Sequence, residues 1–149
     1  DHGRSVKQTN DGGYIITGST SSYGYGTSDI YLLKLDSSGM YQWSKPIGGT
    51  GVEWGASVLQ TNDGGFAIAG YTNSFGAGGY DVYLVRTDSA GEVLWSKTYG
   101  GIDWDFGYSV CSTSDGGLEN RSSPSHGKLC GAQTSRDNTL NGPSLGTNY

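Results

Sequence analysis

The sequence predicts an all-β protein built from repeated, four-stranded antiparallel sheets. Three observations support this prediction. The 149 residues include 27 glycines and only three prolines, and 12% of them are aromatic, a composition typical of short strands joined by tight turns. No segment has the sustained apolar spacing of a helix. One pattern also recurs every 52 residues, without insertion or deletion.

The repeat is clearest at short motifs that return at this spacing. Trp-Ser-Lys occupies residues 43–45 and 95–97, and Asp-Gly-Gly occupies residues 11–13, 63–65 and 115–117. Aligning the first 52 residues with the next 52 gives 26 identical positions. We therefore expect two complete repeats and the start of a third, at residues 1–52, 53–104 and 105–117.

The first unit divides into four expected strands, at residues 5–9 (SVKQT), 14–20 (YIITGST), 29–36 (DIYLLKLD) and 40–47 (MYQWSKPI). Asn10 to Gly13 form a strong turn signal, and Gly39 can take the positive φ of a second tight turn. Pro46 suits an edge strand because it cannot donate a ladder hydrogen bond. The short links predict an antiparallel meander.

The third expected strand is apolar on both faces. Ile30 and Leu32 point one way, while Tyr31 and Leu33 point the other. Such a sheet must be covered on both sides, and stacked four-stranded sheets cover one another. A β-propeller arranges sheets of this kind radially, as blades around an axis. We therefore predict β-propeller blades whose ring is incomplete in one chain.

Four repeated positions carry structural expectations. Gly18 and Gly70 lie within strands, where a glycine usually marks a bulge or a close backbone approach. Trp43 and Trp95 lie on the fourth strand of each unit. We expect both indole rings to wedge between adjacent units.

The pattern SVxQTxDGG(Y/F), followed by Asp-x-Tyr-Leu, LDSSG or TDSAG, WSK and Gly-Gly, resembles tandem repeats in secreted or surface β-propeller proteins of bacteria and archaea. The segment from Asp36 to Gly48, with Trp43 inside it, also resembles the tryptophan-docking motif of quinoprotein-like propellers. This resemblance covers residues 1–117 and implies no quinone cofactor. It implies an extracellular or cell-surface location, although no signal peptide is visible at the start.

The charge balance excludes some partners. The formal net charge is −5 and the sequence pI is about 4.7, which argues against nucleic acid and against docking on anionic membranes. No apolar run is long enough to span a bilayer.

Candidate catalytic residues are few. Asp103 and Asp105 could act as a carboxylate pair in glycoside hydrolysis, or they could simply cap turns. Ser125 lies beside His126, and a hydrolase triad is defined by geometry. The GxSxG elbow of many esterases is absent.

Metal and disulfide expectations rest on equally few residues. Asp63 and Asp115 lie in turns whose oxygens could hold a structural calcium ion, but no spaced calcium loop is present. We expect no other cofactor. Cys111 and Cys130 are either two unrelated thiols or a single disulfide.

Aromatic residues in the Gly-rich loops are candidates for ligand binding, namely Tyr23, Tyr25, Phe75 and Tyr80. Aromatic faces stack on sugars and anchor protein contacts, so carbohydrate and protein are the expected ligands. The alternative is that these rings fold back over the sheet edge.

Residues 118–149 depart from the repeat. They contain no Trp or Phe, and Tyr149 is their only Tyr. One interpretation is a tail that is not native propeller sequence, from a cloning junction, a frameshift or a truncation. The other is a divergent third blade. The composition favours loop or partial disorder.

Two complete units cannot close a ring, so we expect a homo-oligomer, with a dimer favoured by closed symmetry. Near-exact repetition suits a scaffold, whereas catalysis needs an asymmetric site. The predicted function is therefore a non-catalytic interaction or adhesion module. The alternative is a hydrolase, either an esterase or lipase or a glycoside hydrolase, with its site at a propeller rim or a subunit interface.

Overall fold

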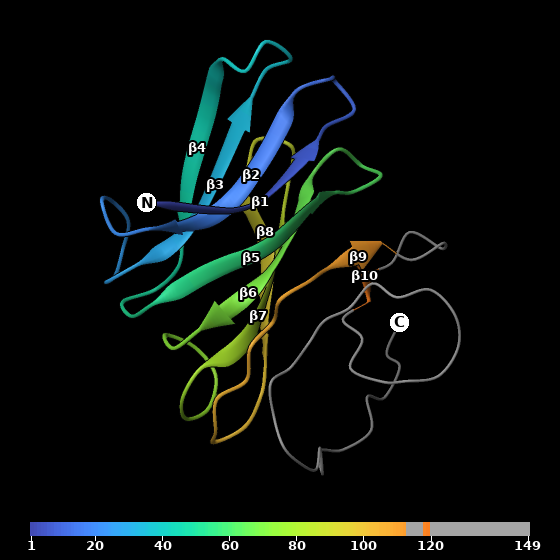
Figure 1. The fold of residues 1–149 in the computed structure, drawn as a ribbon. Helices are drawn as coiled ribbons and strands as arrows, with labels where there is room; N and C mark the ends of the chain where they lie inside the picture. The colour runs from blue at the N-terminus through green and yellow to red at the C-terminus, as the bar shows by residue number, and fades with distance from the viewer. Residues whose placement is uncertain (113–117, 120–149) are drawn as a thin grey trace.

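The computed structural model describes residues 1–112 and 118–119 (Figure 1). Within these residues the protein is all-β and contains no helix. The part of the chain described therefore also has no helix that could cross a membrane. Figure 1 shows two twisted sheets, one formed by the N-terminal residues and one by the residues that follow.

Each repeat forms one four-stranded antiparallel sheet, in which neighbouring strands follow one another along the chain. The first sheet consists of β1 (His2–Gln8), β2 (Tyr14–Thr20), β3 (Asp29–Leu35) and β4 (Tyr41–Ile47). The second consists of β5 (Glu53–Gln60), β6 (Phe66–Thr72), β7 (Asp81–Thr87) and β8 (Val93–Tyr99). A short pair, β9 (Cys111–Ser112) and β10 (Leu118–Glu119), follows.

The predicted all-β class and the four antiparallel strands of each unit are confirmed. β2 has the predicted bounds, but β1 begins at His2, three residues before the predicted start at Ser5. The register between β1 and β2 shifts between Gly3 and Ser5, so an irregularity interrupts the first strand without ending it. The same shift recurs in the second sheet, between Gly55 and Ser57.

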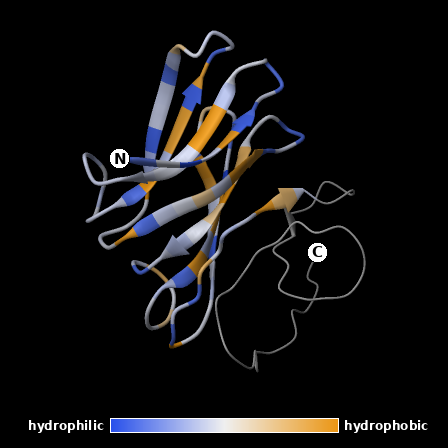
Figure 2. Cartoon of the chain, viewed as in Figure 1, coloured by the Kyte–Doolittle hydropathy of each residue, from blue (hydrophilic) through white to orange (hydrophobic). Residues whose placement is uncertain are grey.

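The main core lies between the two sheets, where apolar side chains of one face of each sheet meet (Figure 2). Its buried members are Ile15, Ile30, Leu32 and Ile47 from the first sheet and Val58, Phe66, Ile68, Tyr83 and Val85 from the second. Trp43 of β4 packs against this core, with its ring 6.0 Å from that of Phe66. A Cβ on Gly91 would lie 2.7 Å from the Trp43 ring, so the turn before β8 forms the other wall.

The residues that follow the second unit pack on the second sheet in the same way as the second unit packs on the first. The Glu53 amide donates to the Ser28 carbonyl at 2.8 Å, and the Asp105 amide donates to the Tyr80 carbonyl at 2.6 Å, each partner being 52 residues further on. Val110 then packs against buried side chains of the second sheet, namely Ala67, Ala69 and Leu84. Residues 105–110 therefore begin to cover the second sheet as β5 covers the first.

Among residues 1–112, no second sheet covers the other face of the first sheet in this way. We call it the open face; it consists of Val6, Tyr14, Ile16, Tyr31, Leu33 and Leu35. The residues at the same repeat positions in the second unit are Val58, Phe66, Ile68, Tyr83, Val85 and Thr87, and all are buried against the first unit or at its edge. Val6 is 57% exposed, whereas Val58 is fully buried. The open face thus has the composition of an interface between units.

Candidate functional site

The aspartates of the repeated Asp-Gly-Gly turns are held by neighbouring donors. Asp63 accepts hydrogen bonds from the Thr61 hydroxyl at 2.7 Å, the Gly65 amide at 3.3 Å and the guanidinium of Arg86. The Thr61 hydroxyl and then Arg86 lower the pKa of Asp63 to about 2. Asp11 has the equivalent partners, with Lys34 as the cation, and its pKa is also well below the usual range.

Asp63 and Asp115 were predicted to be possible calcium ligands, and the contacts of Asp63 compete with that role. The Asp63 carboxylate already has a cationic partner, and Asp115 lies outside the described residues. Residues 1–112 contain no cluster of three or more His, Cys, Asp or Glu side chains that could hold a metal ion. The alternatives of two unrelated thiols or a disulfide between Cys111 and Cys130 both involve Cys130, which also lies outside the described part of the chain.

A pair of buried carboxyl groups lies where the first unit meets the second. Asp29 is 1% exposed and Glu53 is fully buried. One oxygen of each, Asp29 Oδ1 and Glu53 Oε2, lies 2.2 Å from the position that a Cβ on Gly48 would occupy, so their separation is at most twice that distance. Asp29 Oδ1 has no hydrogen-bond partner, whereas Glu53 accepts from the Gly49 amide and the Thr72 hydroxyl.

The same arrangement recurs after the second unit. Asp81 Oδ1 and Asp105 Oδ2 lie 2.1 and 2.8 Å from the position of a Cβ on Gly100, and Asp105 accepts from the Gly101 amide at 3.1 Å. Burial, together with the charge of Asp105, raises the pKa of Asp81. Asp81 is 1% exposed and Asp105 is partly buried. Because the pair recurs at the same position of the second junction, it belongs to the packing of the units.

Of the other predicted catalytic residues, only Asp103 lies in the part of the chain that the structure describes. Asp103 is an exposed residue in the segment after β8, two positions before Asp105. Ser125 and His126 lie outside the described residues. The structure therefore pairs Asp105 with Asp81, which the sequence analysis did not single out.

The four predicted aromatic ligand residues are not gathered at one site. The Tyr23 hydroxyl donates to Ser44 Oγ at 2.9 Å, and burial raises the pKa of Tyr23. Tyr25 is 69% exposed. The Phe75 ring packs against Tyr83, at 5.6 Å between centroids, whereas Tyr80 belongs to a separate aromatic cluster.

Tyr25 borders a cleft of about 420 Å³ between the two sheets. Its other lining residues include Tyr83, Gly48 and an ion pair that joins Lys45 of β4 to Glu92 of the turn before β8. The ion pair crosses from one unit to the other and raises the pKa of Lys45. The cleft reaches Gly48, beside the buried carboxyl pair, and its two charged lining residues, Lys45 and Glu92, are paired with each other.

A larger feature lies at one end of the second sheet. We call it the aromatic rim; it consists of Trp54, Tyr71, Tyr80, Trp104, Phe106 and Tyr108. Trp54 at the start of β5 and Tyr71 at the end of β6 are register partners, and their rings stack at 5.8 Å. Tyr71 meets Phe106 edge-on at 4.8 Å. The rim therefore joins two strands to the segment that follows β8.

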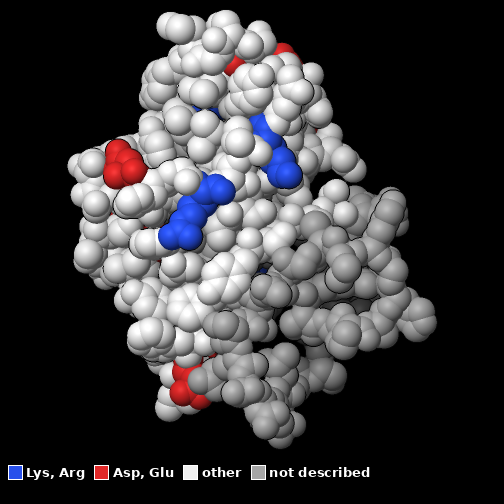
Figure 3. All heavy atoms as spheres, viewed as in Figure 1, with Lys and Arg blue, Asp and Glu red and all other residues white. Residues whose placement is uncertain are grey.

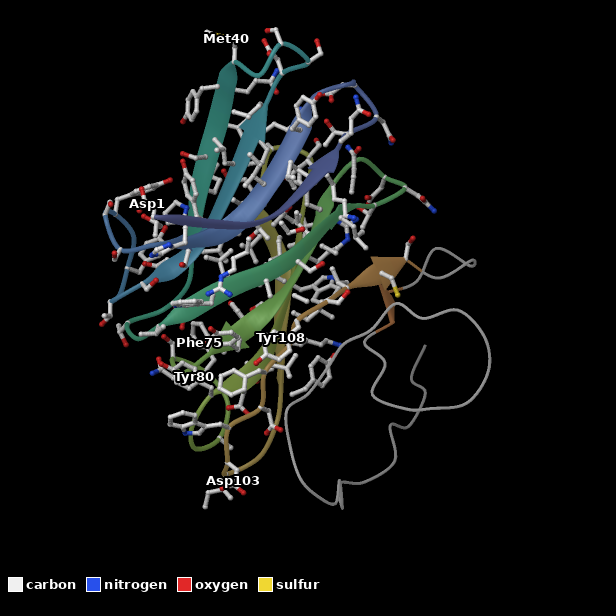
Figure 4. The ribbon with its side chains drawn as sticks, viewed as in Figure 1. Asp1, Met40, Phe75, Tyr80, Asp103 and Tyr108 are labelled. Carbon is white, nitrogen blue, oxygen red and sulfur yellow. The ribbon has the colours of Figure 1, made fainter. Side chains whose placement is uncertain are left out.

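The rim continues without a break to two exposed rings. Tyr80 contacts Trp104 edge-on at 5.5 Å, and Phe106 stacks with Tyr108 at 6.2 Å. Trp104 is 60% exposed and Tyr108 is 43% exposed. In Figure 4 the labelled Tyr80 and Tyr108 lie at the same end of the second sheet, with Asp103 beyond them. The guanidinium of Arg4 lies 4.4 Å above the Trp54 ring.

Five of the six rim residues were missed by the sequence analysis, which named only Tyr80. The signal was present, because the first unit carries small or polar residues at several of the same repeat positions. The charged side chains on the face drawn in Figure 3 are few and separate, and most of that surface is uncharged.

No family model matches the sequence. The chain is similar to the regulatory protein FlaEY of Caulobacter vibrioides, with 29% identity over 106 residues. The match covers 62% of this chain and 11% of FlaEY, so the chain corresponds to a small part of that relative.

Proposed function

We propose that the chain is a non-catalytic interaction module, formed by blades of a β-propeller from a surface or secreted protein. The observation that carries the proposal is the repeated relation between units. The hydrogen bonds from Glu53 to Ser28 and from Asp105 to Tyr80 occupy equivalent positions, so each unit sets the place of the next. A constant step between four-stranded meanders is the relation that a propeller requires.

The carboxyl pairs support a non-catalytic role over the alternative of a hydrolase. A catalytic acid and base need access to substrate and different environments. Asp29 and Glu53 are instead enclosed, and the pair of Asp81 and Asp105 repeats their arrangement one unit later. Because a carboxyl pair recurs at both described junctions, at Gly48 and at Gly100, its role is to hold the units together.

The similarity to a regulatory protein is compatible with a module that acts through partners. FlaEY is called regulatory, and the matched region is a small part of it. Repeat modules within larger proteins commonly provide binding surfaces, because their loops vary on a constant scaffold.

A further copy of the chain is the proposed partner of the open face. Val6 and Tyr31 of that face correspond to Val58 and Tyr83, which are buried against the first unit. An apolar sheet face with this composition favours cover by another unit of the same kind. The proposal is therefore a homo-oligomer, with a two-fold dimer favoured by closed symmetry.

Sedimentation velocity of the purified chain tests the proposed self-association, and electron microscopy tests the proposed propeller arrangement. We expect an oligomer in which the sheets are arranged radially, and a lower mass for Val6→Lys than for the control Val93→Lys. A stable, fully folded monomer would contradict the proposed self-association. Reproducible turnover of simple esters or glycans, lost on changing Asp105, would contradict the non-catalytic role and support the hydrolase.

A further inference from the structure

The two junctions of this chain differ in aromatic content, although their backbone contacts are equivalent. Four rim residues stand where other units carry different residues: Tyr71 for Ser19, Tyr80 for Ser28, Trp104 for Val52, and Tyr108 for Ala56. The first junction packs without these rings, so they are not needed to join two units. Their concentration at one end of one sheet indicates a local role.

The scaffold has changed to admit the largest of these rings. The Trp104 side chain lies against Gly79, where a Cβ would be 2.1 Å from Trp104 Cδ1. The first unit has Thr27 at the position of Gly79 and Val52 at the position of Trp104. The second unit therefore differs from the first at both positions of this contact. The absence of a side chain at Gly79 makes room for the indole of Trp104.

Contacts within the rim fix the orientation of its exposed rings. Trp104 meets Tyr80 and Phe106 edge-on, with interplanar angles of 87° and 90°. Tyr108 stacks on Phe106. Rings held in this way lose little conformational entropy when a ligand covers them. Trp104 nevertheless remains 60% exposed, so a large apolar surface is available for contact.

The charges beside the rim narrow the class of ligand. Asp103 and Asp105 lie on either side of Trp104 in the chain, and the protein as a whole has a net charge of −5. The Arg4 guanidinium lies 4.4 Å above the Trp54 ring of the same rim, so the rim carries charges of both signs and does not select a strongly charged ligand. A neutral ligand with many hydroxyl groups suits such a surface, and a pyranose ring combines such hydroxyls with apolar C–H faces.

We propose that the aromatic rim binds neutral oligosaccharides, with Trp104 and Tyr108 stacking on sugar rings and the exposed carboxylate of Asp103 accepting hydrogen bonds from hydroxyl groups. This proposal rests on the proposed interaction module and names its ligand. Trp104 and Tyr108 present exposed ring surface, which favours a stacked sugar over a quaternary ammonium ion enclosed by aromatic faces.

Titration calorimetry of the full chain with cello-, malto-, xylo- and chito-oligosaccharides tests the proposal. We expect at least one series to bind with a Kd of about 1 mM or tighter, and longer oligomers to bind more tightly than short ones. The double variant Trp104→Val with Gly79→Thr restores the residues of the first unit, so it should fold. We expect it to weaken binding by roughly tenfold or more, a loss of about 1.4 kcal/mol.

Trp95→Ala is the matched control, because Trp95 is a partly exposed tryptophan on β8 outside the rim. It should bind as the parent chain does. Absence of binding in all four series, or equal binding by the double variant, would overturn the proposal. Binding of tetramethylammonium in place of every sugar would also overturn it and identify an aromatic cation site. A failure to bind sugars would overturn this proposal without contradicting the proposed non-catalytic function. Cleavage of an oligosaccharide in the same mixtures would contradict the non-catalytic function.

Discussion

Replacing Gly48 by alanine would place a methyl group between two buried carboxyl groups. The new Cβ would lie 2.2 Å from both Asp29 Oδ1 and Glu53 Oε2, far inside van der Waals contact. Neither carboxyl group can move without disturbing its hydrogen bonds, which come from Tyr25 and Gly26 amides to Asp29 and from the Gly49 amide to Glu53. The substitution therefore strains the junction between the two units.

The expected loss in the free energy of unfolding has two sources. Overpacking of an enclosed site costs about 1–3 kcal/mol. Leaving one buried hydrogen-bonding group unsatisfied costs about 1–3 kcal/mol, and relaxation reduces the sum. We expect Gly48→Ala to lower the free energy of unfolding by about 2–4 kcal/mol. Urea titration monitored by tryptophan fluorescence measures this as a lower midpoint at an unchanged slope.

Gly101→Ala is the control for this experiment. A Cβ on Gly101 meets no atom within 4 Å, and the residue is exposed. Its effect should stay within about 0.5 kcal/mol, because alanine also restricts the unfolded chain. Equal stability of the Gly48→Ala and Gly101→Ala proteins would refute the reasoning, since it would mean that the carboxyl groups are not held as the structure places them.

Three further predictions concern stability. Trp43→Ala should lower the free energy of unfolding by about 2–4 kcal/mol in urea titrations, because it empties the space between the sheets, whereas Trp95→Ala should cost much less. The lowered pKa of Asp63 contributes stability above pH 3.8 that is lost as the pH falls toward about 2, so Asp63→Asn should flatten the thermal stability curve in this acid range. The raised pKa of Asp81 has the opposite effect: its contribution to stability is present below pH 3.8 and is lost as the pH rises through the raised value. Asp81→Asn should therefore remove a decline in melting temperature over the pH range that begins at 3.8 and ends above the raised pKa.

The strands were predictable because their signals are local. Period-two alternation and the Asn-Asp-Gly-Gly turn sequence define β2 to the residue, and Gly39 and Gly91 take the same positive φ of 82° in equivalent turns. The early start of β1 was not predictable. It depends on how the strand pairs across a register shift at Gly3, which is a property of two strands together.

The candidate sites were less predictable because they depend on contacts between units. Asp81 and Asp105 are 24 positions apart in the sequence, and only the packing of residue 105 on the second sheet brings their carboxyl groups together. Likewise, Tyr80 was recognised as an isolated loop aromatic. Its neighbours Trp104 and Phe106 lie in the segment after β8, at the end of the second unit and the start of the third, so the rim forms only when that segment packs back on the second sheet.

Repetition separates structural from functional residues in a chain of this kind. Residues that are identical at equivalent positions, such as Asp29 and Asp81, make the same contacts twice and are explained by the packing that both units share. Residues that differ between equivalent positions are released from this requirement, and most such differences are scattered over the surface. The replacement of Val52 by Trp104 is unlike them, because the glycine that seats the indole has changed as well. A paired change that leaves a large ring exposed adds apolar surface that folding does not bury, and a ligand that covers this surface gains that burial free energy. The aromatic rim is therefore the part of the molecule where binding best explains the sequence.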